Sequence, residues 1–385
     1  MLMCSVLMLT CASASSSASS APSASAPLQG FISFLHYVGP QTAPKPVLAA
    51  LDLSSGKIST LAALQELDSS LLQQSTAFLD APTNVWVLSM QEDANLTDGR
   101  LVQLDWATKK LAPTLASTYC WAVFSTPNPD QVLCLTEWPF WNYSTAPSRS
   151  PRVRRMRHRE HRSAPDAART RGAVAAPPLQ QEQFILLLDR ATGAATQVNR
   201  GWSDNDVPSN DVITVDRTDP DDHIIIAWMS DAVTNDNTLY TVQASTGKVL
   251  SKRPTSPSVI LYNLEFNHAS SAPGGENSNS TFGIATSYEP GKPFVSFFAR
   301  FHAELGTWAQ IGPSGAFDKY GYIEGVAAAA PSIGVYFAMA SSLNNVTKEA
   351  AFTLLGVDTK TGLVVYEQDL STMTYLSAIH YHATL

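Results

Sequence analysis

With 385 residues, the chain has room for two ordinary domains or for one large all-β domain. Hydrophobic residues make up 44%, which excludes a largely disordered chain, and charged residues only 15%. The net charge of −8 is unevenly spread, because nine of the 25 basic residues and two of the 33 acidic ones lie between Arg149 and Arg171. The rest of the chain is therefore strongly acidic, which argues against nucleic acid or an anionic membrane as its partner.

The N-terminus has the pattern of a secretory signal peptide, which we predict over residues 1–14. Met1–Leu9 is an apolar run too short to span a membrane, and Ala12, Ser13 and Ala14 supply a small-residue cleavage site. Residues 15–29 are an Ala/Ser/Pro-rich linker, and residues 30–385 form a single domain. No later run reads as a membrane span. We therefore expect a secreted, monomeric protein without a transmembrane segment.

Two covalent features agree with secretion. Asn-x-Ser/Thr sequons, the acceptors of N-linked glycans, occur at Asn95, Asn142, Asn279 and Asn345. After removal of the signal peptide only Cys120 and Cys134 remain, on either side of a Pro-Asn-Pro-Asp turn. We expect a disulfide across an antiparallel hairpin in which Phe124 faces Asp130; the alternative is a pair of buried free thiols.

A repeated pattern organises the domain. A strand that ends in Asp, a Thr-Gly-type turn and a second strand recur, because Asp caps such a turn and Gly supplies its positive φ. The copies lie at residues 48–59, 101–112, 186–196, 239–250 and 354–365, with a degenerate copy at 298–310. Two further apolar runs separate successive copies, so each unit holds four short strands, which is typical of a propeller blade.

The ends of the chain predict how the ring closes. Three strands precede the second unit, and one strand, residues 375–383, follows the last repeat. Together they complete one blade without open sheet edges. We therefore predict an all-β, six-bladed β-propeller with four-stranded antiparallel blades, closed by the C-terminal strand. The repeats resemble those of the YVTN-like and quinoprotein-like propellers, at the level of the fold; this resemblance implies no cofactor.

Residues 145–178 form a basic insert, which we place in the second blade between its second and third strands. The insert is too polar and Arg-rich to fold alone, which favours a disordered surface loop or retained non-coding sequence. A second interpretation is proteolytic processing, because Arg152, Arg154 and Arg155 match the R-x-R-R pattern of secretory convertases. A third is contact with acidic polysaccharide.

Metal-site candidates are weak. Residues 209–223 carry five aspartates, but the spacing is wrong for an EF-hand loop and a solvated turn is the simpler interpretation. His380 and His382 alternate on one face of the closing strand. They become metal ligands only if His36 or a carboxylate converges on them.

A ligand of a propeller would sit over the central tunnel, where the innermost strands begin. We expect these strand starts to present Tyr119, Asp211, Asn263, Glu324 and Tyr375. A ring of Asp, Asn and Glu at such positions resembles the metal site of six-bladed lactonase-type propellers, by fold-level analogy.

The sequence contains no motif of a nucleophilic, metal-dependent or nucleotide-binding enzyme. Our leading hypothesis is a non-enzymatic binding module for an extracellular glycan or protein, with no cofactor. The alternatives are a Ca²⁺-dependent lactonase-type hydrolase that uses carboxylates at the tunnel mouth, and a structural coat or wall protein.

Overall fold

The fold was analysed in a computed structural model of the chain. The structure describes residues 28–38, 45–64, 76–80, 85–91, 99–112, 115, 120, 122–137, 183–198, 206–216, 221–231, 237–255, 259–263, 265–268, 279–287, 293–302, 307–343 and 350–384. These residues form strands almost throughout, with two short 3₁₀ turns at Asp318–Tyr320 and Pro331–Ile333. Among them, no helix is long and apolar enough to cross a membrane.

The described residues form six antiparallel sheets, which we number in chain order. The first sheet has the order β25-β1-β2-β3, with β25 Thr374–His382, β1 Phe31–Val38, β2 Lys45–Asp52 and β3 Ile58–Ala63. The second contains β4 Thr76–Asp80, β5 Val85–Gln91, β6 Gly99–Asp105 and β7 Lys110–Leu111. The third contains β8 Ala122–Ser125, β9 Gln131–Glu137, β10 Gln183–Asp189 and β11 Ala195–Val198.

The other three sheets follow the same up-and-down order. The fourth contains β12 Asp206–Asp216, β13 Ile224–Asp231, β14 Asn237–Gln243 and β15 Val249–Pro254. The fifth contains β16 Val259–Leu261, β17 Glu265–His268, β18 Asn279–Ser287, β19 Val295–His302 and β20 Thr307–Ile311. The sixth contains β21 Tyr322–Ala330, β22 Val335–Leu343, β23 Ala350–Asp358 and β24 Val364–Asp369.

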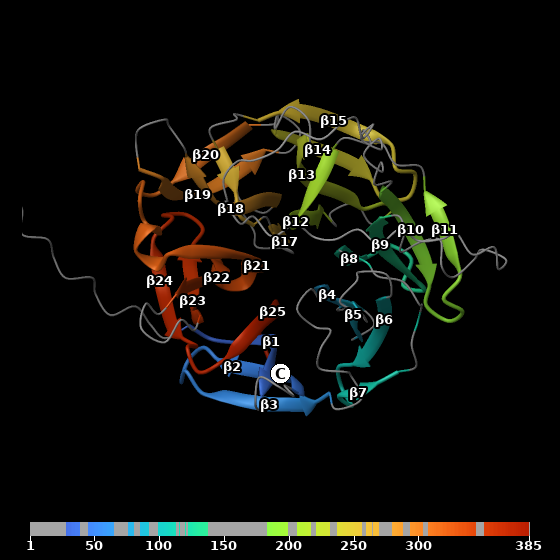
Figure 1. Cartoon of the computed structure of the whole chain (residues 1–385), viewed down its shortest axis with the longest axis horizontal. Coiled ribbons are helices and arrows are strands. Elements are labelled where there is room, and N and C mark those ends of the chain that lie inside the picture. Colours follow the sequence, from blue (N-terminus) through green and yellow to red (C-terminus); the bar gives the residue numbers. More distant parts are fainter. Residues whose placement is uncertain are drawn as a thin grey trace, which may run out of the picture.

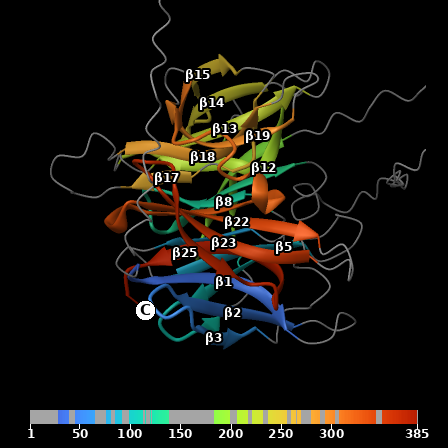
Figure 2. The same ribbon diagram turned by 90° about the vertical axis from the view of Figure 1, so that its left-hand side faces the viewer.

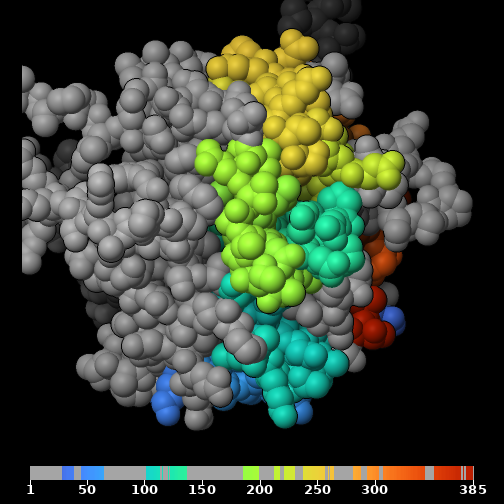
Figure 3. Space-filling view, turned by 90° about the vertical axis from the view of Figure 1, so that its right-hand side faces the viewer, coloured from blue at the N-terminus to red at the C-terminus, as the bar shows by residue number. Residues whose placement is uncertain are grey.

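The sheets stand around a central axis, with one edge strand of each facing inward (Figure 1). The inner strands contact one another in the order β25, β4, β8, β12, β17, β21 and back to β25, so the ring is closed. Figure 2 shows β25, β1, β2 and β3 in succession from the inside to the outside of the first sheet. The outer parts of the second, third and fourth sheets lie side by side on one side of the molecule (Figure 3).

Burial is high in the strands that neighbouring sheets cover on both faces and falls at the outermost strand of a sheet. β14 is buried at every residue except Gln243, and accordingly it contains no charged residue. The outermost strand β24 alternates between half-buried and exposed residues, since one of its faces meets solvent. The apolar core therefore lies between the sheets, in separate clusters such as Phe282, Phe298, Tyr336 and Leu355 between the fifth and sixth sheets.

Closure of the ring occurs as the sequence predicts. The C-terminal β25 pairs antiparallel with β1, with Phe31 opposite His382 and Ser33 opposite His380. The first sheet is thus built from three strands of the N-terminal part and one of the C-terminal part. Ile379 of β25 is buried in the cluster shared by the first and sixth sheets. The architecture is that of a β-propeller.

Five of the six sheets have the four strands expected of a blade, and the fifth sheet differs by having five. Its β16 and β17 both pair with the same strand, β18, with Leu261 opposite Ala285 and Glu265 opposite Phe282. They are two halves of one inner strand that is interrupted around Asn263. A β-bulge at the inner edge, rather than an added strand beyond it, explains the difference.

The Asp turns have the geometry that the repeat predicts. The carboxylate of Asp52, Asp105, Asp189 or Asp358 accepts a hydrogen bond from the backbone N–H three residues later, at 3.2, 2.7, 2.7 and 2.7 Å. The glycine position of the turn has φ of 66° at Gly362. In the second sheet this position is Lys109, the one residue other than glycine with a positive φ (57°) in the described part of the chain.

Gly362 also touches the neighbouring sheet, which gives a test of the packing. A Cβ at Gly362 would lie 2.1 Å from the carbonyl oxygen of Ile311, whereas one at Gly334, with the same φ, would meet only Thr359 Oγ1 at 3.9 Å. We expect Gly334→Ala to cost about 1 kcal/mol from backbone strain, and Gly362→Ala about 3 kcal/mol or more from strain and overpacking together. Thermal unfolding measures both; equal losses would contradict the contact.

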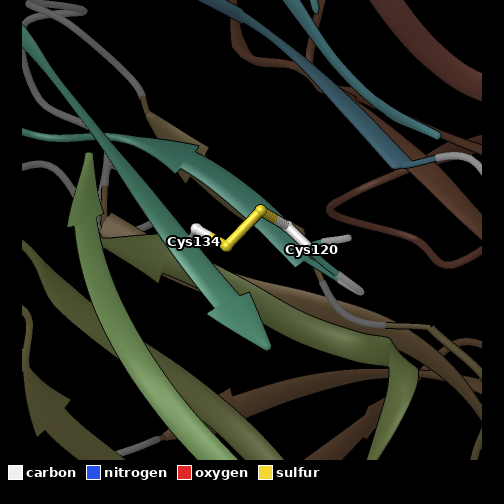
Figure 4. Close-up of a disulfide and its surroundings, with 2 residues drawn as sticks. All are labelled: Cys120 and Cys134. Carbon is white, nitrogen blue, oxygen red and sulfur yellow. A yellow bond between two sulfur atoms is a disulfide. The ribbon is translucent and has the colours of Figure 1, made fainter. Parts of the chain in front are cut away.

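The disulfide between Cys120 and Cys134 is present, with a Cα–Cα distance of 5.4 Å (Figure 4). The register predicted around it is wrong: Phe124 lies opposite Leu133, not Asp130, and Val123 lies opposite Cys134. The turn sets this register, because Thr126 and Asn128 close it through their own side-chain hydrogen bonds. Cys120 therefore reaches Cys134 from the segment before β8.

The basic insert lies between β9 and β10, which are the second and third strands of their sheet. That sheet is the third in chain order, so the insert lies one blade later than the second blade in which we expected it. Residues 145–178 themselves, with Arg152, Arg154 and Arg155, lie outside the described residues. So do the sequons at Asn95, Asn142 and Asn345, while Asn279 begins β18.

Candidate functional site

Two of the five predicted tunnel residues, Asn263 and Glu324, have described side chains, and the structure brings them together. Tyr119 lies outside the described residues. Asp211 lies in β12 and Tyr375 in β25, where the structure describes the course of the backbone. Tyr375 and Glu324 lie near the beginning of inner strands, as expected. Asp211 instead lies in the middle of its strand, and Asn263 between the halves of its own.

The inner strands of three consecutive sheets are irregular where these residues occur. The pairing of β12 with β13 shifts register between Pro208 and Ile213, around Asp211. The inner strand of the fifth sheet is interrupted at Asn263, and β21 shifts register between Ile323 and Ala327, around Glu324. Bulges of this kind reorient side chains and are frequent beside binding sites. This shared irregularity makes the inner edges of the fourth to sixth sheets the candidate site.

Asn263 is a structural residue of this site. Its Oδ1 accepts hydrogen bonds from Tyr336 Oη at 2.8 Å and from the Ile284 backbone N–H at 3.0 Å, and its Nδ2 donates to the Glu324 carbonyl at 3.1 Å. The side chain is fully buried. Because a carboxamide oxygen has two lone pairs, both acceptor positions are used. Asn263 therefore joins the fifth and sixth sheets, and its amide oxygen has no lone pair left for a metal ion.

The residue opposite Asn263 explains why the interruption is tolerated. Gly283 of β18 faces the bulge, and a Cβ there would lie 2.2 Å from the Asn263 carbonyl oxygen. The amide of Asn263 takes the Ile284 N–H that a regular inner strand would bond with its backbone, as Asn side chains often do at bends. The pair of Asn263 and Gly283 thus fixes the position of the strand that leads to the exposed part of the site.

The exposed part of the site consists of Tyr322, Glu324, Ser341 and Tyr262. Tyr322 pairs with Ser341 across β21 and β22, and the Ser341 hydroxyl donates to Glu324 Oε1, so these three side chains share one face of the sixth sheet. Tyr262 of the fifth sheet contacts Tyr322 edge to face, with ring centroids 5.5 Å apart and an interplanar angle of 78°. The Tyr322 side chain is 54% exposed. The site therefore offers an aromatic ring beside an oriented carboxylate.

The histidines predicted as metal candidates do not converge. His382 Nε2 and Ser33 Oγ share a hydrogen bond of 2.6 Å. The His382 ring also stacks on Trp106, with ring centroids 4.6 Å apart. His36 lies an odd number of residues from Ser33 in β1, so it faces the other side of the sheet. No group of three His, Cys, Asp or Glu residues in the described part of the chain is arranged to hold a metal ion.

The His382 stack instead joins the first and second sheets. Trp106 follows β6, and the Lys109 ammonium lies 3.3 Å from the centre of its indole ring. Burial, with the charge of Lys109 as a smaller cause, lowers the pKa of His382 from 6.5 to about 4. Burial also lowers the pKa of Lys109, which the carboxylate of Asp105 partly offsets. His382 is therefore neutral in the folded protein under neutral conditions, and it holds the closing strand through packing.

This stack predicts a loss of stability in mild acid. The unfolded chain binds a proton at His382 near pH 6.5, but the folded chain does so only near pH 4. Stability is therefore complete above about pH 6.5 and declines towards pH 4, by roughly 3 kcal/mol in total. Urea unfolding across this range measures the decline. His382→Gln should flatten most of it, while the buried His36, whose pKa is also lowered by burial, keeps the remainder; an unchanged slope would contradict the assignment.

No protein-family model matches the chain, and no curated protein matches it in sequence. Solved structures do match. TolB from Acinetobacter baumannii is similar with a TM-score of 0.52 and 11% identity, covering 92% of this chain and 67% of that one. The β-propeller domain of the Trilobed protease from Pyrococcus furiosus is similar with a TM-score of 0.38 and 7% identity, covering 75% of this chain and 71% of that one.

A putative 6-phosphogluconolactonase from Bacteroides uniformis is similar with a TM-score of 0.46 and 10% identity, covering 92% of this chain and 99% of that one. At such identities the likeness concerns the fold alone. The likeness to TolB agrees with the ring of sheets described above: the chain is a β-propeller, and its function has to be argued from the site.

Proposed function

We propose that the chain is a secreted six-bladed β-propeller that binds an extracellular glycan or protein and has no catalytic activity. The observation that carries the proposal is that buried and exposed residues of the site have different roles. Asn263 is buried and uses its hydrogen-bonding atoms to join two sheets, while Tyr322 and Glu324 remain partly exposed beside it. A rigid support beneath an exposed aromatic and acidic surface suits recognition.

The compartment is part of the same proposal. The buried disulfide between Cys120 and Cys134 supports an oxidising environment, since such bonds are rare in cytosolic proteins. The signal peptide over residues 1–14 and the glycans at Asn95, Asn142, Asn279 and Asn345 belong to this proposal, as do a monomeric state and the absence of a cofactor. Mass spectrometry of the secreted protein, before and after glycosidase treatment, tests the N-terminus and the four sequons together.

A Ca²⁺-dependent hydrolase is the second candidate, and the aligned bulges favour it. Irregular inner strands in three consecutive sheets place Asp211, Asn263 and Glu324 at comparable positions. The saturated hydrogen bonds of Asn263 argue against it, because a metal ligand needs a lone pair. Only rearrangement of the link between the fifth and sixth sheets would release that residue.

The experiment compares the two candidates directly. Purified secreted protein is assayed for bound calcium, for hydrolysis of a panel of lactones, and for binding to arrays of glycans and extracellular proteins, each with and without EDTA. Our proposal expects saturable binding that persists in EDTA, and no hydrolysis. Lactone hydrolysis that is lost in EDTA and in Glu324→Gln or Asp211→Asn would overturn it in favour of the hydrolase.

Processing at Arg152, Arg154 and Arg155 would leave a recognisable product. β9 and β10 flank the insert and pair along their whole length, from Gln183 opposite Glu137 to Asp189 opposite Gln131. The disulfide lies entirely before the insert. A cut after Arg155 should therefore give two fragments that separate on a denaturing gel without reductant and elute together as one native species. Absence of residues 145–178 from secreted material would instead rule out both functional interpretations of the insert.

A further inference from the structure

We infer that Tyr322, Glu324 and Tyr262 form a binding site for a neutral saccharide ring. The inference rests on the proposed binding function and names its ligand class and its residues. Tyr322 is one of the few large hydrophobic side chains with more than half of its surface exposed among the described residues. An exposed phenol offers an apolar ring face and a polar hydroxyl at its edge, which suits the C–H face and the hydroxyls of a sugar.

The aromatic part of this saccharide site is fixed before a ligand binds. The edge-to-face contact with Tyr262 restrains the Tyr322 ring from the neighbouring sheet. Gly321, with φ of 81°, lies directly before β21 and so close to β22 that a Cβ would lie 2.8 Å from the Ser341 carbonyl oxygen. The backbone that carries Tyr322 is therefore held close to its partner strand. A ring that is already oriented loses little conformational entropy on binding.

The polar part of the saccharide site is the Glu324 carboxylate. Ser341 donates to its Oε1, and Asn263 donates to the backbone carbonyl of the same residue, so the side chain and the main chain of Glu324 are both held. A carboxylate has about four acceptor positions, of which Ser341 uses one. The others suit two adjacent hydroxyl groups of one sugar ring, which donate to a carboxylate through charge-assisted hydrogen bonds.

Charge selects a neutral sugar over an acidic one. The Glu324 carboxylate lies within the saccharide site, and the whole chain carries a net charge of −8. A uronic acid or a sulfated sugar would bring a second negative charge beside Glu324, which like-charge repulsion opposes. In the described part of the chain, the hydrogen bonds that hold Glu324 come from Ser341 and Asn263, and neither side chain carries a positive charge that would compensate an acidic sugar.

The test measures binding of neutral and acidic oligosaccharides, first on an array and then by isothermal titration calorimetry with the best neutral one. We expect Tyr322→Ala to weaken binding on the order of tenfold through loss of ring stacking, and Glu324→Gln to weaken it similarly through weaker hydrogen bonds. Tyr322→Phe, which keeps the ring, should retain most of the affinity. Leu363→Ala, at another exposed position, is the matched control and should bind like the original chain.

The outcomes separate the inference from the proposed function. If a neutral glycan binds but Tyr322→Ala and Glu324→Gln bind it equally well, the saccharide site is wrong and the binding function stands. If the array shows acidic glycans or proteins alone as ligands, the saccharide site is likewise wrong. If the protein binds nothing and hydrolyses a lactone, the proposed function itself fails. Thermal melting checks that each variant folds. Both substitutions should be tolerated, because Tyr322 is exposed and Glu324 is partly exposed.

Discussion

A chain that ends at Met373 is expected to lose its cooperative fold. It lacks β25, the inner strand of the first sheet, and with it the contacts of that strand with β4 and β21. Buried Ile379 and the His382–Trp106 stack are removed as well. The edge of β1, a strand buried at six consecutive residues, becomes open to pairing with other chains. Size-exclusion chromatography and circular dichroism should show aggregates or exchanged dimers without a cooperative melt.

The matched control for this truncation is a chain that ends at His382. It keeps the whole of β25 and loses only the residues that follow. We expect it to elute as the full chain does and to melt within a few degrees of it. If the chain that ends at Met373 also elutes and melts like the full chain, β25 does not close the ring, and the fold described above is contradicted.

The second large effect is expected at Asn263. Asn263→Ala leaves the Tyr336 hydroxyl and the Ile284 N–H buried without the acceptor that both now use, and the Glu324 carbonyl without its donor. Each buried unsatisfied group costs about 1–3 kcal/mol, so a loss of about 4 kcal/mol in the free energy of unfolding is expected. Urea unfolding measures this loss.

A double-mutant cycle shows whether the loss comes from these hydrogen bonds. Tyr336→Phe removes one donor and should cost about 1 kcal/mol by itself. In the double variant the Tyr336 hydroxyl is no longer left unsatisfied, so the combined loss should be smaller than the sum by about 1 kcal/mol. Additivity within the error of the measurement would indicate that the Asn263–Tyr336 hydrogen bond contributes little to the loss, which would then come from the other two bonds or from packing.

Much of the fold follows from local chemistry and can therefore be predicted from the sequence. The Asp turns recur because the same side-chain hydrogen bonds form at Asp52, Asp105, Asp189 and Asp358. Apolar runs between them mark the inner strands, which are buried on both faces. The lone strand after the last turn predicts closure, since an unpaired inner strand needs a partner.

Features that depend on contacts between residues remote in sequence could not be predicted in this way. The bulge in the fifth sheet arises because Asn263 bonds Ile284 and Tyr336, residues that are remote in sequence, and because Gly283 leaves room for it. The register around Cys134 was misjudged because the turn, and not the disulfide, determines which residues of β8 and β9 face each other. Both effects are tertiary and have no periodic signal.

At the candidate site, too, some features could be predicted from the sequence and others could not. The sequence indicates Glu324 and Asn263 because both were expected where an inner strand begins, although Asn263 lies between two halves of its strand. Their roles differ for a reason that only the structure gives: one is buried between sheets and the other lies at a partly exposed edge. Tyr322, Tyr262 and Ser341 were missed, although the glycine between Tyr320 and Tyr322 is a signal that the backbone turns sharply before the strand.

The central claim is a ring closed by pairing of the two ends of the chain, which holds the fifth and sixth sheets and their exposed site in place. Amide hydrogen exchange tests it most directly. Peptides covering β25 and β1 should both be strongly protected and should lose protection together as denaturant is added. Rapid exchange throughout β25 under conditions in which β1 and β2 stay protected would contradict it.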